Sequence, residues 1–495
     1  MAQAELAPAA APPRPAVTER PFRLAQVAVA IILLFKIYLA FAGPPVGDEA
    51  YYWIWGQKLG WSYFDHPPLH AWLLRVVSVF GWNLFSLRLL TWLTLGGTLW
   101  IFWLWAKRLK PEDPAAWFWP TAAIYLASPV FFWTSGISFH DHLLTFLCIA
   151  SASVFLRFAE TWEATGKGWR WLYLAATLLG LAVLTKYNGV LLGIGVAVFF
   201  VVHKPLRPLW RSPHLYLAGL LSVALQAPVI WWNITEGFAS YKFHLSERWG
   251  GELFKFTPTH ALTFVALTFV AVGPFLFPAI IRLIRKPLGT PFADRARSLA
   301  LSVFVVSTLT MGFLSFFIEI FFYWNIVAYI LMMPMLAGWF VRRRVMLAHI
   351  IFGALIALTY SYHSTINPAN DWTLSSTFGW NAVAKRVAVF EKKYKTDFVA
   401  ATRYTTAAQL AFAMHDPEVT AIADRHDQYD YWFDPAAHEG KDAIVVSDQR
   451  LGLKEIEGHF DKLTKLQTVP YKQFGLTIYS PTIYLGKRYH SKSTK

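Results

Sequence analysis

Apolar runs of membrane-spanning length recur through the first ~360 residues of this chain, and they restrict its fold more than any other feature. A helix needs about 20 predominantly apolar residues to cross the hydrocarbon core of a bilayer. Charged residues make up only 15% of the chain, whereas about 25% is usual in soluble domains. The sequence therefore predicts a polytopic, all-α membrane protein.

Basic residues gather in short loops between the apolar runs, and they set the predicted topology. The five clusters are Lys107, Arg108 and Lys110; Lys167 and Arg170; Lys204, Arg207 and Arg211; Arg282, Arg285, Lys286, Arg295 and Arg297; and Arg342, Arg343 and Arg344. Cytoplasmic loops of membrane proteins carry an excess of Lys and Arg. Placing these clusters in the cytoplasm gives about eleven spans, or up to about thirteen if further crossings are hidden in the longest apolar stretches.

This threading divides the chain into three regions. Residues 1–21 are rich in Ala and Pro, and we expect them to form a disordered cytoplasmic tail. Residues 22–361 form the predicted transmembrane domain, and 43–83 is its first external loop. Residues 362–495 are more polar and form the predicted domain outside the membrane.

The predicted external domain combines helical and strand-like segments. Residues 381–394 and 405–414 have helical spacing, whereas 396–401 and 442–448 resemble strands. This mixture predicts a small α/β fold.

The formal charge of +15 does not indicate a nucleic-acid partner, because the excess lies in the membrane region. The last 134 residues carry 17 Lys+Arg and 15 Asp+Glu, so the outer domain is nearly neutral. Cys148 is the only cysteine, which excludes an internal disulfide.

Acidic residues gather just after the first apolar run, in GDEAYYWIWGQKLGWSYFDHPPLHAW (47–72). Asp48 and Glu49 follow that run directly, and Asp65 and His66 precede two prolines that suit the first turn of a new helix. The helix after the prolines is amphipathic, which is typical of a segment lying on the membrane surface. The loop is therefore predicted to hold these side chains close to the interface.

A second acidic cluster, SFHDHLL, places His140, Asp141 and His142 at the outer end of the fourth predicted span. By topology it faces the same compartment as Asp48. Carboxylates there can accept a proton from an attacking hydroxyl or bind a divalent cation, which suits chemistry on a lipid headgroup. Two structural alternatives remain open, since Glu49 could be merely solvated and Asp141 could cap its own helix.

Several motifs resemble those of bacterial polytopic glycosyltransferases. The matching segments are DEAYYW (48–53), SYFDHPPL (62–69), HDHLL (140–144), VLTKYNG (183–189), WNITEGFASYKFHLSER (232–248), RHDQYDYWFDP (425–435) and GKDAIVVSD (440–448). The family consists of GT-C-fold, protein-mannosyltransferase-like enzymes of the glycosyltransferase family 39 type, relatives of the lipid A aminoarabinose transferase. The likeness covers most of the chain.

The resemblance implies transfer of a sugar, with inversion, from a polyprenyl-phosphate donor to an envelope acceptor such as a glycolipid, a polysaccharide or a protein. It also implies a bacterial inner-membrane location with the C-terminal domain in the periplasm. On this reading Asp48 matches the acid that contacts the acceptor and serves as base, and Asp141 matches the second catalytic acid. No P-loop or Gly-rich dinucleotide motif occurs, so no nucleotide cofactor is expected.

The chain departs from the family at Asp65 and His66, where aminoarabinose transferases have Glu-Lys. That lysine is thought to meet the donor phosphate, so either His66 or another cation must replace it. A divalent metal is one candidate, with Asp65, His66, His140 and His142 as ligands. Mixed oxygen and imidazole ligands favour zinc or manganese over calcium.

Other residues are candidates for substrate binding. The cations Lys58, Lys186, Lys242 and Arg248 lie on the outer side and suit a departing phosphate. Glu49, Tyr52 and Tyr187 lie in the matching motifs and are candidate substrate contacts, and Trp324 and Asn325 are placed to touch the sugar or to pack structurally.

A transporter or lipid flippase is the main alternative, and a non-catalytic scaffold is a second. A transporter predicts ionisable residues in the middle of spans and broken helices in matching halves. This chain places its acids at the ends of spans, which favours the transferase.

Overall fold

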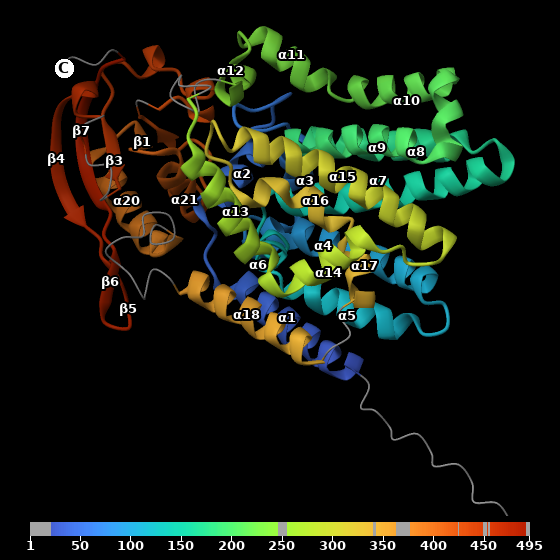
Figure 1. Cartoon of the computed structure of the whole chain (residues 1–495). Coiled ribbons are helices and arrows are strands. Elements are labelled where there is room, and N and C mark those ends of the chain that lie inside the picture. Colours follow the sequence, from blue (N-terminus) through green and yellow to red (C-terminus); the bar gives the residue numbers. More distant parts are fainter. Residues whose placement is uncertain are drawn as a thin grey trace, which may run out of the picture.

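The structure is a computed structural model that describes residues 21–245, 255–339, 343–362, 377–423, 425–448, 453 and 456–491. A bundle of helices occupies most of it, and a mixed α/β domain lies against one end of the bundle (Figure 1). The predicted combination of a helical polytopic part and a C-terminal α/β part is confirmed at this level.

The helices before the α/β domain are α1 (Pro21–Ala42), α2 (Gly47–Gln57), α3 (Leu69–Val77), α4 (Leu84–Leu109), α5 (Pro114–Ala127), α6 (Pro129–Thr134), α7 (His140–Thr165), α8 (Trp169–Thr185), α9 (Val190–Val202), α10 (Pro213–Ala224), α11 (Ala227–Thr235), α12 (Ala239–Leu245), α13 (Pro258–Val272), α14 (Phe277–Arg285), α15 (Pro291–Leu314), α16 (Ile326–Ile330), α17 (Met333–Leu336) and α18 (Arg343–Ser361). Short 3-10 helices include η2 (Tyr187–Gly189), η3 (Lys204–Arg211) and η6 (Phe322–Asn325).

Fewer helices are long enough to cross a membrane than the sequence predicted. Among the described residues, five helices qualify by length and hydropathy, namely α1, α4, α7, α15 and α18, and the count rises to eight if three bent pairs are each one span. Prolines account for part of the difference. Pro129 separates α6 from α5, and Pro274 follows Gly273, where one pair bends by 81°.

Residues in or next to three of the basic loops meet at one end of the bundle, which agrees with the predicted grouping of these loops on one side. Arg108 near the end of α4 pairs with Glu160 of α7, and Arg295 in the first turns of α15 pairs with Glu160 at 3.3 Å and Glu163 at 2.6 Å. His203 after α9 contacts Glu163 at 2.7 Å. Because α7 begins at His140 and ends at Thr165, this network lies at the opposite end of that helix from Asp141.

This polarity leads to a testable topology. A reporter fused to the C-terminus should be active only in the exterior compartment, because the outer domain lies at the end opposite the basic network. A fusion truncated after Lys110 should give the reverse result and serves as the control. Cytoplasmic activity of the C-terminal fusion would overturn the predicted orientation.

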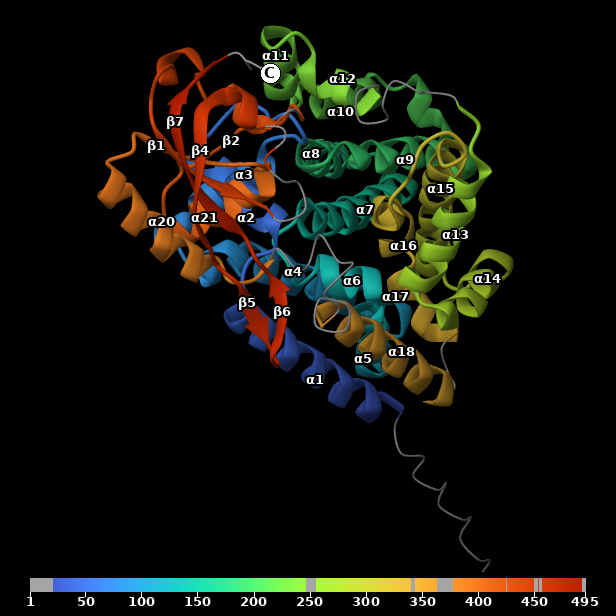
Figure 2. The same ribbon diagram turned by 90° about the vertical axis from the view of Figure 1, so that its left-hand side faces the viewer.

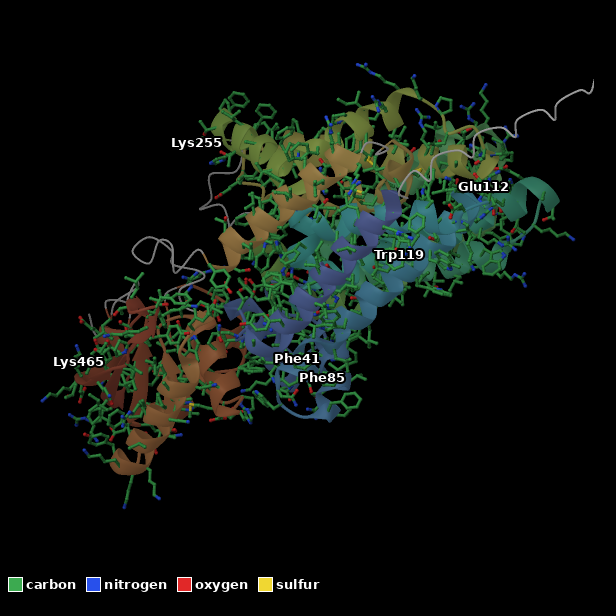
Figure 3. The ribbon with its side chains drawn as sticks, turned by 90° about the horizontal axis from the view of Figure 1, so that it is seen from below. Phe41, Phe85, Glu112, Trp119, Lys255 and Lys465 are labelled. Atoms are coloured by element: carbon green, nitrogen blue, oxygen red, sulfur yellow. The ribbon has the colours of Figure 1, made fainter. Side chains whose placement is uncertain are left out.

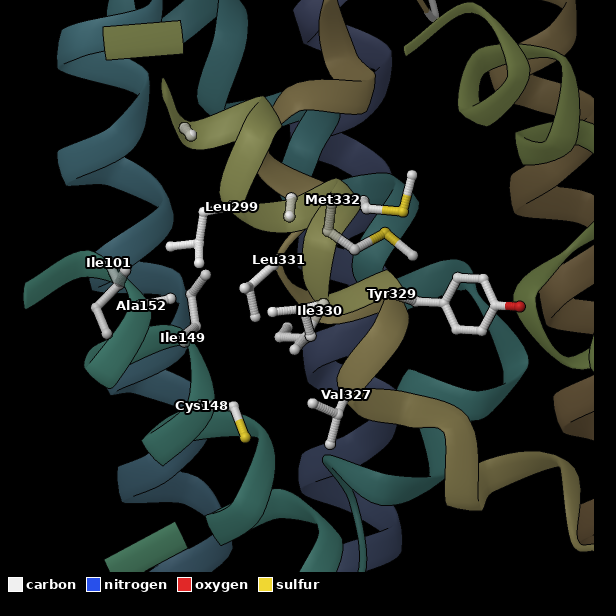
Figure 4. Close-up of a cluster of buried hydrophobic side chains, with 14 of the residues drawn as sticks. Ile101, Cys148, Ile149, Ala152, Leu299, Val327, Tyr329, Ile330, Leu331 and Met332 are labelled. Carbon is white, nitrogen blue, oxygen red and sulfur yellow. The ribbon is translucent and has the colours of Figure 1, made fainter. Parts of the chain in front are cut away.

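The core of the bundle holds α7 in place. Cys148 and Ile149 of α7 pack with Leu299 of α15 and with Val327 and Ile330 of α16 (Figure 4), and all five are buried. Mutual packing of these apolar side chains fixes the helix whose first turn carries Asp141.

Helices α5 and α18 pack so closely that only glycine fits between them. A Cβ atom added at Gly353 of α18 would lie 1.8 Å from the carbonyl oxygen of Ala127 in α5. Figure 1 shows α18 beside α1 along the lower side of the bundle. This part of the bundle lies next to the α/β domain.

The outer domain contains α20 (Trp380–Tyr394), β1 (Phe398–Ala401), α21 (Tyr404–Met414), β2 (Thr420–Ala421), β3 (Ala443–Ser447), β4 (Phe460–Thr468), β5 (Tyr471–Gln473), β6 (Leu476–Tyr479) and β7 (Thr482–Tyr489). The main sheet has the order β2-β1-β3-β7-β4. Strands β2, β1 and β3 are parallel, whereas β7 runs antiparallel to β3 and β4. The predicted helices and strands of this region are confirmed as α20, α21, β1 and β3.

The first external loop and the outer domain share one hydrophobic core. Trp53 and Trp55 of α2 are fully buried, together with Leu74 of α3, Leu410 of α21 and Ile444 of β3. Figure 2 shows α2 and α3 beside α21. The outer domain therefore packs directly on the first loop. This packing brings residues of both parts to one site.

Candidate active site

A pocket of about 100 Å³ lies where the first loop, the outer ends of α7 and α8, and the outer domain meet. Seven of the candidate residues predicted from the sequence line it: Asp48, Tyr52, Asp65, His66, Asp141, Lys186 and Trp324. Three lining residues that the sequence reasoning missed are Tyr51, Tyr404 and Arg425. The structure thus brings together carboxylates from separate segments of the chain.

Asp48 lies in the first turn of α2, where the positive end of the helix dipole favours a carboxylate. The hydroxyl of Tyr404, the first residue of α21, donates a hydrogen bond to Asp48 Oδ1 at 3.3 Å. Burial and the charge of Asp48 raise the pKa of Tyr404 well above its ordinary value, so this phenol remains a donor. One wall of the pocket therefore belongs to the outer domain.

Asp141 and Lys186 form a buried ion pair in the same pocket. Lys186 follows α8, and its Nζ donates to Asp141 Oδ1 at 2.8 Å and Oδ2 at 2.9 Å. The ammonium also lies 5.0 Å from the ring centre of Tyr323. Asp141 therefore holds the Lys186 ammonium at the pocket wall, and this ammonium can face an anionic group of a substrate.

Asp65 is held by a chain of hydrogen bonds that begins in the outer domain. Tyr51 donates to Asp65 Oδ2 at 3.1 Å and accepts from the backbone N–H of Gln428 at 3.0 Å. The side-chain oxygen of Gln428 in turn accepts from the N–H of Phe64 at 2.7 Å. The segment that carries Asp65 and His66 is thereby clamped between α2 and the outer domain.

Tyr51→Phe should lower kcat/KM by about tenfold to a hundredfold, because a hydrogen bond to a charged group contributes about 1.5–3 kcal/mol. Tyr429→Phe is a matched control. Its ring lies 5.9 Å from that of Tyr51, and its buried hydroxyl has no hydrogen-bond partner among the described residues. Initial rates of sugar transfer by the two purified variants decide the outcome. Equal losses would show that the Tyr51 hydroxyl has no special role.

Comparison with known proteins connects this geometry with an activity. Residues 65–232 match the family described as dolichyl-phosphate-mannose-protein mannosyltransferase. The lipid A galacturonosyltransferase RgtD of Rhizobium johnstonii is 27% identical over 387 residues, which cover 74% of this chain and 77% of that protein. The chain is a membrane glycosyltransferase related to this family. The resemblance inferred from the sequence is thereby confirmed.

The fold of the transferase agrees with solved structures of ArnT from Cupriavidus metallidurans. The apo structure has a TM-score of 0.59 at 15% identity, and the structure bound to undecaprenyl phosphate has a TM-score of 0.58 at 16% identity. Each alignment covers 94% of the transferase and 98% of the ArnT chain. At these identities the comparison shows the GT-C fold alone.

Four histidines of the transferase form a row that starts at the pocket with the partly exposed His66 and continues through the buried His140, His70 and His142. The ring centres are 4.4 Å apart for His66 and His140, 4.6 Å for His140 and His70, and 5.2 Å for His70 and His142. The row ends at Thr94, whose hydroxyl lies 2.8 Å from His142 Nδ1. The sequence analysis did not select His70.

The proposed metal ligands are not assembled as a metal site. Within the described ranges, no group of three or more His, Cys, Asp or Glu side chains is arranged to hold a metal ion. Asp65 Oδ2 accepts from Tyr51, and His142 Nδ1 is engaged by Thr94. The four expected ligands, Asp65, His66, His140 and His142, therefore do not fit a shared metal in this arrangement, and we derive no step through one.

Glu49 lies outside the pocket, although the sequence suggested a substrate contact. It is fully buried and accepts from Arg88 of α4 through Nε at 2.9 Å and Nη2 at 2.7 Å. It also accepts from the backbone N–H groups of Val46 and Ser138. We assign it a structural role, because all of these contacts face the interior.

The remaining candidates lie around the pocket or apart from it. Lys58 pairs with Glu418 at 2.9 Å at the far end of α2. Tyr187 shares a hydrogen bond with Ser240 at 2.9 Å. Asn325 is buried and accepts from Ser307 at 2.6 Å, so it ties η6 to α15.

Of the two remaining predicted cations of the outer side, Lys242 is described and is not among the described residues that line the pocket. Lys242 lies in the last turn of α12. Arg248 lies outside the described residues.

Proposed function

We propose that the chain transfers a sugar from a polyprenyl-phosphate carrier to a lipid A-type glycolipid on the outer face of the inner membrane. One observation carries the proposal: Asp48, Asp65 and the Asp141–Lys186 pair line a single pocket at the outer end of the bundle. Support for the donor comes from the undecaprenyl phosphate bound by ArnT, which shares the fold. Support for the acceptor comes from RgtD, a lipid A galacturonosyltransferase.

The reaction requires one base and stabilisation of one leaving group. The acceptor hydroxyl oxygen forms a bond to the anomeric carbon of the sugar, and the bond from that carbon to the carrier phosphate oxygen breaks. The electron pair leaves with the phosphate, and the hydroxyl proton passes to Asp48. Attack from the face opposite the phosphate inverts the anomeric configuration.

Lys186 and Arg425 are the candidate groups that stabilise the departing phosphate. Both line the pocket with fixed positive charge, and preorganised cations at a developing anion are a large source of catalysis. His66 occupies the position of the family lysine and also faces the pocket. It assists as a cation only when it is protonated.

The test combines genetics and reconstitution. Mass spectrometry of envelope glycolipids should show one sugar-bearing species that disappears when the gene is deleted and returns with the wild-type gene. The purified protein in lipid nanodiscs should then make the same species from the lipid-linked sugar. Unchanged glycolipids after deletion, with the modified species found instead on protein or polysaccharide, would reject the lipid acceptor.

A further inference from the structure

A cavity of about 740 Å³ lies on the other side of α2 from the candidate active site. Helices α1, α6 and α18 supply its membrane side, and α20, α21 and β5 supply its outer side. The pocket and the cavity share no lining residue. Arg88, which pairs with the buried Glu49, and Gln409, which donates to the carbonyl oxygen of Pro45 at 2.6 Å, belong to the cavity wall. The cavity is therefore distinct from the site of sugar transfer.

Lys36 places a buried amino group in the wall of this cavity. It belongs to α1, a candidate membrane span, and its side chain is only 2% exposed. Its Nζ donates to the carbonyl oxygen of Phe132 and lies 4.3 Å from the centre of that ring. No carboxylate among the described residues lies within ion-pair distance of this amino group, so it has no protein counter-ion there.

An ionisable residue inside a span is costly and usually marks a functional site. An ammonium has three donors, and Lys36 uses one on Phe132. The residue lies six positions before the end of α1, which corresponds to about 9 Å along the helix. That depth suits the phosphate of a lipid headgroup rather than the centre of the bilayer.

The walls around Lys36 suit acyl chains and a polar headgroup. Tyr38 and Phe41 of α1, the helix along the lower edge of the bundle in Figure 1, also line the cavity and are 58% and 60% exposed. Figure 3 shows Phe41 beside Phe85 at this edge of the bundle, with ring centres 6.4 Å apart. On the outer side, Trp380 of α20 and Gln409 of α21 line the cavity, and both belong to the outer domain.

We propose that this cavity binds an anionic glycerophospholipid, with the headgroup phosphate on Lys36 and the acyl chains along α1. A lipid bound there touches both the membrane helices and the outer domain, so it stabilises the docking of the two. The proposal does not depend on the sugar-transfer activity, because binding is measured without donor or acceptor.

Native mass spectrometry of the full-length protein in detergent micelles tests the proposal with two probes, dioleoyl phosphatidylglycerol and dioleoyl phosphatidylcholine. The wild type should bind the anionic lipid at least about tenfold more tightly. Lys36→Met should abolish that preference, whereas Lys465→Met, an exposed lysine of β4 (Figure 3), should retain it. An unchanged preference in Lys36→Met would reject the proposal.

A second variant keeps the test decisive if Lys36→Met does not fold. A Cβ atom at Gly136 would lie 3.0 Å from Lys36 Nζ, so Gly136→Ala retains the charge but crowds the phosphate position. It should weaken phosphatidylglycerol binding by several-fold and reduce the rise in Tm that this lipid produces. Equal binding by wild type and Gly136→Ala would count against the site. Displacement of phosphatidylglycerol by lipid A at equal concentration would show that the cavity is an acceptor site and overturn the proposal.

Discussion

Asparagine in place of Asp48 is expected to lower sugar transfer by about 10²–10⁴-fold, the usual contribution of a positioned general base. Asparagine has nearly the same shape and keeps an oxygen that can accept from Tyr404, whose hydroxyl lies 3.3 Å from Asp48 Oδ1. It cannot accept the proton of the acceptor hydroxyl. The loss should therefore fall on kcat, with little change in KM for either substrate.

The control for Asp48→Asn is Tyr404→Phe, which removes the hydrogen bond but leaves the carboxylate. Its cost should be about tenfold, because a hydrogen bond to a charged group contributes about 1.5–3 kcal/mol and this one is long, at 3.3 Å, so we expect the lower end of that range. Both proteins should elute as the wild type does from gel filtration in detergent. Near-normal turnover of a folded Asp48→Asn protein would exclude this residue as the base and move the role to Asp65.

The sequence located much of the pocket because membrane topology limits where loops can meet. Asp48, Asp65 and Asp141 are assigned to one side of the bilayer simply by counting spans between basic loops. The structure brings them to one pocket with Lys186, which the sequence also placed on the outer side. This prediction needed no detailed geometry, because side chains at the external ends of neighbouring helices have few other places to lie.

The residues that the outer domain contributes to the pocket could not be predicted from the sequence in the same way. Tyr404, Arg425 and Gln428 reach the pocket or its supports through contacts with α2 and the first loop, more than 350 residues earlier in the chain. Local periodicity carries no information about such pairings. The only sequence pattern that pointed to Arg425 and Gln428 was the acidic, aromatic stretch RHDQYDYW (425–432). This stretch resembled the family, but the sequence did not indicate which part of the molecule it contacts.

Glu49 shows how adjacency in sequence can mislead. Successive residues of a helix point about 100° apart around its axis, so neighbours in α2 face different surroundings. Asp48 lines the pocket, whereas Glu49 is turned into the interior toward Arg88. A sequence reading that treats the two acids alike cannot separate a substrate contact from a structural pair.

The second large effect is expected from that pair, and it concerns stability. Arg88→Met should destabilise the protein by about 3–5 kcal/mol, because it leaves Glu49 as a buried charge without its partner. Arg88 also donates to the carbonyl oxygens of Leu39, Ala40 and Gly43, which end α1. Denaturation of the purified variant in detergent micelles measures the loss.

A double-mutant cycle separates the two interpretations of Glu49. If Glu49 is structural, Glu49→Gln should also destabilise, and Glu49→Gln with Arg88→Met should cost less than the sum of the single changes by about 0.5–3 kcal/mol. Glu418→Gln is a suitable control, because its ion pair with Lys58 is largely exposed on the glutamate side and should contribute less than about 1 kcal/mol. A substrate contact predicts the opposite pattern for Glu49→Gln, with wild-type stability and a raised KM. Additive losses in the cycle would show that Glu49 and Arg88 act independently, and the coupling between the start of α2 and the end of α1 would then need another cause.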